Sequence, residues 1–192
     1  HATTADFARD AASGIEFLRT LKCFSKVGVL GHSEGGPIAF MLGAKGKVDF
    51  VISMAGIGVR GDTALTAQAN RLLELSGQPM RLSTLQYRVN AYMKKSPWLN
   101  FFMDYDPSGD ISKALCPVMA INGERDVQVI SSLNLIGIKA HLTENPKNFV
   151  KEYPALNHLF QHCTTGNVSE YRMIEETISP EVLEDIVRFI KQ

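Results

Sequence analysis

The sequence has no excess of charge of either sign. Its 192 residues include twenty basic and twenty acidic side chains, so net charge does not favour nucleic acid, an anionic membrane or a polyanionic substrate as a partner. The sequence also lacks a long apolar run. The longest runs, such as residues 48–59, fall well short of the roughly 20 residues that cross a membrane. We therefore expect a soluble chain without a membrane span.

Cysteine is scarce, and its spacing is not that of a metal site. Cys23, Cys116 and Cys163 stand far apart with no C-x-x-C pair, which indicates neither a disulfide framework nor a zinc site. The phosphate-binding patterns G-x-G-x-x-G and G-x-x-x-x-G-K-[ST] are both absent around the glycines of residues 31–36. We expect no metal, nucleotide or redox cofactor.

Residues 31–36 form a nucleophile-elbow pattern. They read Gly-His-Ser-Glu-Gly-Gly and match G-x-S-x-G, with Ser33 at its centre. The preceding residues 26–30 predict a short buried strand, and residues 37–44 predict a helix with proline in its first turn. A strained turn and a close strand-to-helix approach require small flanking residues, which Gly31, Gly35 and Gly36 supply. We interpret Ser33 as a nucleophile; the alternative is a glycine-rich turn with an inert serine.

The rest of the chain alternates helices and strands and predicts an α/β fold. Residues 48–55 are continuously apolar, as a parallel sheet covered on both faces demands. Residues 61–114 contain no clear strand, and we predict that they form a helical cap inserted into a mostly parallel sheet flanked by helices. Within this cap, helical patterns at 65–75 and 82–93 precede a loop-like run at 97–105. Further strands are predicted at 117–122 and 149–153, and further helices at 4–22, 131–142 and from Ser179 onward.

A base and an acid for the serine lie in later loops. Asp126 comes just past the end of a predicted strand, where open parallel sheets place their ligand sites, and His158 follows the last strand. A serine hydroxyl needs such a base, and the base needs a group that fixes its tautomer. The order serine, aspartate, histidine is that of α/β-hydrolases. His162 as the base and Glu124 as the acid remain alternatives.

The motifs at 31–36, 122–126 and 156–160 resemble those of an α/β-hydrolase. The chain is similar to the carboxyl-terminal part of bacterial esterases and acyl hydrolases related to the prolyl oligopeptidase and dienelactone hydrolase groups. The resemblance covers essentially all of residues 1–192, interpreted as one partial domain with its N-terminal strands absent. It implies a serine carboxylester hydrolase that acts on a small-molecule ester of a small or medium acyl group.

The resemblance also assigns roles. Ser33 attacks the acyl carbonyl, His158 passes the serine proton to the leaving alcohol, and Asp126 holds the imidazole. The backbone N–H of Glu34 is one donor of the oxyanion hole, and a loop after an earlier strand supplies the other. That second donor is not located in this sequence. Three large side chains of the cap are expected to line the substrate pocket: Trp98, Phe101 and Phe102. His32 is also expected to border the pocket, as a spacer beside the nucleophile.

The sequence departs from the family pattern before the elbow. Only one helix precedes it, and the first residue is His1, so we expect the natural start upstream and leave the compartment, cytoplasmic or exported, open. The segment alone should expose a sheet edge and an apolar helix face that favour self-association. It should show little activity, because loss of one oxyanion donor costs about 10²–10³ in rate. A serine peptidase, or an inactive fragment serving in binding or assembly, is the alternative function.

Overall fold

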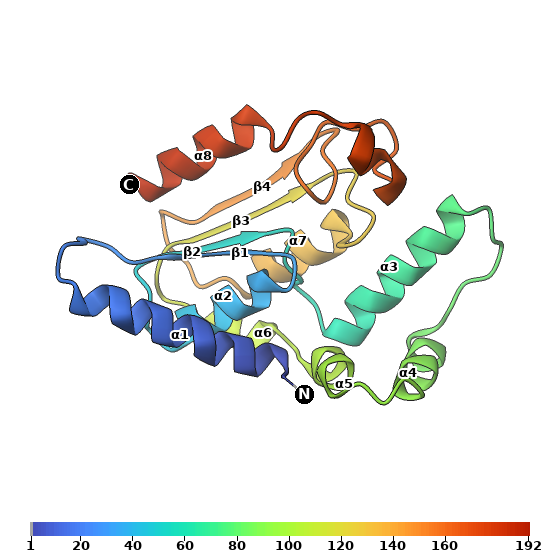
Figure 1. Ribbon diagram of the computed structural model, residues 1–192, viewed down its shortest axis with the longest axis horizontal. Coiled ribbons are helices and arrows are strands. Elements are labelled where there is room, and N and C mark those ends of the chain that lie inside the picture. The colour runs from blue at the N-terminus through green and yellow to red at the C-terminus, as the bar shows by residue number, and fades with distance from the viewer. Residues whose placement is uncertain (1) are drawn as a thin grey trace.

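A four-stranded parallel sheet forms the centre of the molecule. The structure is a computed structural model that describes residues 2–192. The strands lie in the order β1-β2-β3-β4, and every neighbouring pair is parallel (Figure 1). This arrangement confirms the predicted α/β class. The strands are β1 (Val29–His32), β2 (Val51–Met54), β3 (Val118–Gly123) and β4 (Phe149–Tyr153).

Helices cover both faces of this sheet. Alternate residues of β2 enter different cores: Val51 packs with α1, α2, α6 and α7, whereas Ile52 packs with α8. Two buried faces explain why β2 is apolar throughout. The helices are α1 (Thr4–Thr20), α2 (Gly35–Ala44), α3 (Gly61–Leu75), α4 (Thr84–Tyr92), α5 (Pro97–Asp104), α6 (Ser108–Lys113), α7 (Ser131–His141) and α8 (Pro180–Ile190), with a 3-10 helix η1 at Val168–Met173.

Residues 61–114, the predicted cap insertion, contain helices α3 to α6 joined by non-helical segments such as residues 76–83, and one part of the prediction was wrong. Residues 97–104 form α5 instead of a loop-like run. Ser96 caps this helix through its hydroxyl, which accepts from the Leu99 N–H, and Pro97 occupies the first turn. Burial of Leu99, Phe102 and Met103 gives the helix its inner face. Figure 1 shows α3, α4 and α5 beyond the carboxyl ends of the strands.

The strand before the elbow begins later than predicted. The prediction placed it at residues 26–30, whereas β1 spans Val29–His32. Val27 still bonds to Asp49, whose carboxylate accepts from the Val27 N–H at 2.7 Å. Regular pairing with β2 starts only at Val29. The apolar character of the sequence therefore locates the strand approximately, whereas hydrogen bonding to β2 decides which residues belong to it.

The first strand borders an apolar surface. Within the described residues, β1 pairs only with β2, and Leu30 is 49% exposed. Large apolar side chains of α1 and the loop after it are also exposed, among them Phe17, Leu21 and Phe24. An open strand edge beside such a surface is a template for association.

We expect concentration-dependent self-association through this surface. Replacing Leu21 by glutamate places a charge among exposed apolar side chains, so it should shift sedimentation profiles toward monomer without loss of helix content. Glutamate in place of Leu85, an exposed leucine on α4, is the matched control. An equal shift from the control would contradict a role for the β1 edge.

None of the helices described in residues 2–192 combines the length and the apolar character that crossing a membrane requires.

Candidate active site

Ser33 occupies a strained turn between β1 and α2. Its φ is 55°, a left-handed value that few non-glycine residues adopt. The turn is held by the Ser33 N–H, which donates to the Met54 carbonyl at 2.9 Å, and by the Gly36 N–H, which donates to the Ser33 carbonyl at 2.9 Å. Strain of this kind persists where the surrounding structure fixes it, and it is concentrated at functional sites.

Two of the three elbow glycines are sterically required. A Cβ at Gly31 would lie 1.8 Å from the Gly35 carbonyl oxygen, and one at Gly36 would lie 2.6 Å from the Gly56 Cα. The expectation that Gly35 is also needed was wrong, because a Cβ there meets nothing within 4 Å. Close approach of backbone to backbone, more than position in the motif, therefore decides which glycine is essential.

Replacing Gly36 by alanine should destabilise the fold by about 1–3 kcal/mol, because the added methyl group overpacks the contact with Gly56. Gly35→Ala is the matched control, and it should leave stability unchanged or slightly raise it, since alanine restricts the unfolded chain. Urea denaturation of both variants measures the difference. Equal destabilisation by the two substitutions would contradict the steric argument.

Asp126 and His158 form a buried pair beyond the carboxyl ends of β3 and β4. The His158 Nδ1–H donates to Asp126 Oδ2 at 2.7 Å, and both side chains are almost fully buried. The other carboxylate oxygen, Oδ1, accepts from the N–H groups of Gln128 and Val129, each at 2.8 Å. The carboxylate is thereby fixed in orientation, and its bond to Nδ1–H makes Nε2 the acceptor nitrogen of a neutral imidazole.

The two alternative residues have other partners. His162 is exposed and its ring pairs with Glu176 at 2.9 Å. The Glu124 carboxylate accepts from the Ala155 N–H at 2.9 Å and thus holds the loop that leads to His158. Neither side chain contacts the Asp126–His158 pair through a hydrogen bond in residues 2–192.

His32 connects the elbow to the histidine loop. Its Nε2–H donates to the His158 carbonyl oxygen at 2.8 Å, and the two imidazole rings lie 4.6 Å apart. Burial lowers the pKa of His32, which favours the neutral ring. In the described part of the chain no hydrogen bond joins the Ser33 hydroxyl to His158.

Ser33 opens into a small cavity under the cap. Its volume is about 190 Å³, and most of its wall is apolar. Trp98 and Phe102 of α5 stack at a ring separation of 5.6 Å on one side of it. The complete lining is Ser33, Glu34, Ile57, Ala64, Leu65, Gln68, Trp98, Phe102, Gln128 and Val129.

Two residues assigned to this pocket lie elsewhere. Phe101 is not among the lining residues and stacks on Tyr105 at 6.2 Å, because adjacent residues of a helix point about 100° apart. His32 borders a different groove beside Phe160, since it lies on β1 just before the turn and points toward the His158 loop. Neither residue therefore lines the cavity at Ser33, and a contact of either with substrate stays a prediction.

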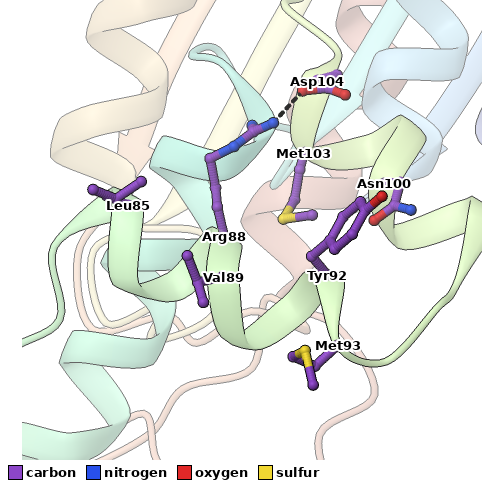
Figure 2. Close-up of a pocket in the computed structure, with 8 residues that line it drawn as sticks. All are labelled: Leu85, Arg88, Val89, Tyr92, Met93, Asn100, Met103 and Asp104. Atoms are coloured by element: carbon purple, nitrogen blue, oxygen red, sulfur yellow. Dashed lines mark hydrogen bonds and ion pairs between the residues drawn. The ribbon is translucent and has the colours of Figure 1, made fainter.

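A larger groove lies on the cap but away from the serine. Figure 2 shows α4 and α5 lining it, with an ion pair between Arg88 and Asp104 at its edge. Its volume is about 510 Å³. Because Ser33, Asp126 and His158 are all absent from its wall, size alone does not identify the reactive site.

Sequence reasoning missed the support of Asp126. Gln128 and Val129 orient the carboxylate through backbone N–H groups, which any residue type supplies. The available signal was positional: an aspartate after a strand commonly accepts from the N–H groups two and three residues on. The described residues contain no group of three or more His, Cys, Asp or Glu side chains placed to hold a metal ion.

Comparison with known structures places this fold among α/β-hydrolases. Est1E from Butyrivibrio proteoclasticus with ferulic acid is 13% identical with a TM-score of 0.58, and the match covers 100% of this chain and 70% of that chain. A monoacylglycerol lipase from Paleococcus ferrophilus is 14% identical with a TM-score of 0.57, and the match covers 98% of this chain and 77% of that chain. A meta-cleavage product hydrolase from Pseudomonas fluorescens IP01 is 13% identical with a TM-score of 0.60, and the match covers 100% of this chain and 72% of that chain. At these identities the likeness concerns the fold. No curated protein sequence matches the chain.

Comparison with protein families is more specific. The model of the family described as BAAT / acyl-CoA thioester hydrolase C terminal matches residues 12–162. This range contains the elbow together with Asp126 and His158. The chain therefore belongs to the BAAT / acyl-CoA thioester hydrolase C-terminal family and is a hydrolase of the α/β-hydrolase type.

Proposed function

We propose that this chain is a serine-dependent acyl hydrolase that cleaves an ester or thioester through an acyl-enzyme on Ser33. The observation that carries the proposal is the buried Asp126–His158 hydrogen bond of 2.7 Å beyond the same sheet edge as a strained serine with φ of 55°. A serine, a base and a group that orients the base are what acyl transfer requires.

In the proposed reaction Ser33 Oγ forms a bond to the acyl carbon while His158 Nε2 takes the hydroxyl proton. The C–O or C–S bond then breaks, and the imidazolium returns that proton to the leaving alcohol or thiol. Water repeats the sequence on the acyl-enzyme and releases the acid. Asp126 stabilises the imidazolium, and the Glu34 N–H, which donates no hydrogen bond within residues 2–192, is free for the oxyanion.

Two features support a small or medium acyl group. The Ser33 cavity measures about 190 Å³ and is lined largely by apolar side chains, which suits a short aliphatic or aromatic acyl chain.

Carboxylic esters are the substrates that the sequence resemblance implies. Thioesters are added because the matching family is described by acyl-CoA thioester hydrolysis.

Two assays on the full-length protein test this function. A fluorophosphonate probe should label Ser33, and mass spectrometry of the labelled peptide identifies the site. Release of p-nitrophenol from p-nitrophenyl acyl esters, compared with thiol release from acyl-CoA of the same acyl chains, distinguishes ester from thioester preference. Absence of both labelling and turnover would refute the proposal and favour a role in binding or assembly.

A further inference from the structure

The Glu34 side chain joins three parts of the fold at one carboxylate oxygen. Glu34 follows the nucleophile, and its Oε1 accepts from the Thr4 Oγ1–H at 2.6 Å and from the Trp98 Nε1–H at 2.6 Å. Thr4 belongs to the first turn of α1 and is fully buried, whereas Trp98 belongs to α5 of the cap. In Figure 1 the N-terminal end of α1 lies beside α5.

These contacts involve no opposite charge. Within residues 2–192, no ion pair links Glu34 to a lysine, arginine or histidine. Hydrogen bonds to an ionised acceptor are stronger than bonds between neutral groups, and Thr4 is shielded from competing water. The orientation of the Glu34 carboxylate therefore depends on its two neutral donors, and the indole of Trp98 depends on the carboxylate.

The indole held in this way is part of the cavity wall. Trp98 stacks on Phe102 with an interplanar angle of 25°, and both rings line the Ser33 cavity with Glu34. A shift of α5 would move both rings together, because they lie on the same helix. The position of this aromatic wall thus determines the room that is left for the acyl chain.

We propose that the Glu34 side chain is a positioning residue that holds the Trp98–Phe102 wall against the elbow and so sets the acyl-chain preference. The acyl preference rests on the proposed function, whereas the contact with the cap does not. The backbone N–H of Glu34 keeps its separate role at the oxyanion when the side chain is replaced.

Trp98 is the single tryptophan of the sequence, so its fluorescence reports directly on this contact. In Glu34→Ala the indole loses its acceptor, and we expect a shifted emission maximum and increased quenching by acrylamide. Glu34→Gln keeps an amide oxygen at the same position and should remain close to wild type. Glu16→Ala, an exposed glutamate on α1 that pairs with Lys47, is the matched control and should change neither signal.

The kinetic measurement compares p-nitrophenyl acetate with p-nitrophenyl hexanoate. In Glu34→Ala the ratio of their kcat/KM values should change on the order of tenfold, mainly through KM for hexanoate, as expected when a pocket wall moves. Glu34→Gln should restore the ratio. Circular dichroism and thermal melting establish that the variants are folded.

Each measurement can overturn one step. Unchanged fluorescence in folded Glu34→Ala would refute the contact that holds the wall, even in a protein without activity. Altered fluorescence with an unchanged acyl ratio would refute the link to specificity. If the wild-type protein hydrolyses neither these esters nor acyl-CoA of the same acyl chains, the acyl preference falls with the proposed function, and the fluorescence result still decides the positioning role.

Discussion

Replacing Ser33 by alanine is expected to lower kcat for acyl ester hydrolysis by at least about 10⁴-fold in the full-length protein, because loss of the nucleophile removes covalent catalysis altogether. The fold should survive. Serine and alanine experience similar strain at a φ of 55°, and the Ser33 side chain is only half-buried. Steady-state kinetics and a thermal melt, run on the same preparation, measure both effects.

A second serine near the elbow supplies the control. Ser53 on β2 is fully buried, and its hydroxyl has no hydrogen-bond partner within residues 2–192. Removing an unpaired buried hydroxyl carries little cost, so Ser53→Ala should keep both turnover and labelling by a fluorophosphonate. Retention of more than about a tenth of the activity by Ser33→Ala would contradict nucleophilic catalysis by this residue.

The sheet was predictable because its signals are local. Apolar runs located the first three strands, and the ends of β4 agree with the prediction at Phe149 and Tyr153. Helix α5 was not predicted, although Ser96 and Pro97 form a start signal, because a run dense in large apolar side chains has no evident polar face. Leu99 and Met103 pack with Ala91 of α4, whereas Phe102 packs with Ala64 of α3 and with loop residues. These packing partners are not encoded in the segment itself.

The proposed catalytic residues were easier to predict than the contacts around them. Ser33 stands in a motif, and Asp126 and His158 follow strands whose carboxyl ends meet at one sheet edge. The bond between Glu34 and Trp98 spans 64 positions, and no spacing rule connects them. His32 was interpreted as a spacer, yet its side chain donates a hydrogen bond to the His158 carbonyl oxygen. This contact was not predictable, because it depends on the register of β1 in the sheet.

Replacing Asp126 by asparagine should lower kcat by about 10⁴-fold with little change in stability. The N–H groups of Gln128 and Val129 hold one oxygen of Asp126, and the asparagine carbonyl oxygen should occupy that position. The amide NH₂ group would then face His158 Nδ1 as a donor. Two donors cannot pair, so the imidazole proton should move from Nδ1 to Nε2. A protonated Nε2 cannot accept the proton of Ser33.

Nitrogen NMR of labelled histidine distinguishes this tautomer change from simple unfolding. The Nε2–H tautomer should predominate in Asp126→Asn, whereas the wild-type protein should show the Nδ1–H form that its 2.7 Å bond to Asp126 requires. Glu124→Gln is the matched control, because its side-chain oxygen can still accept from Ala155. If Glu124→Gln loses activity while Asp126→Asn keeps it, Glu124 is the acid and the assignment of Asp126 is wrong.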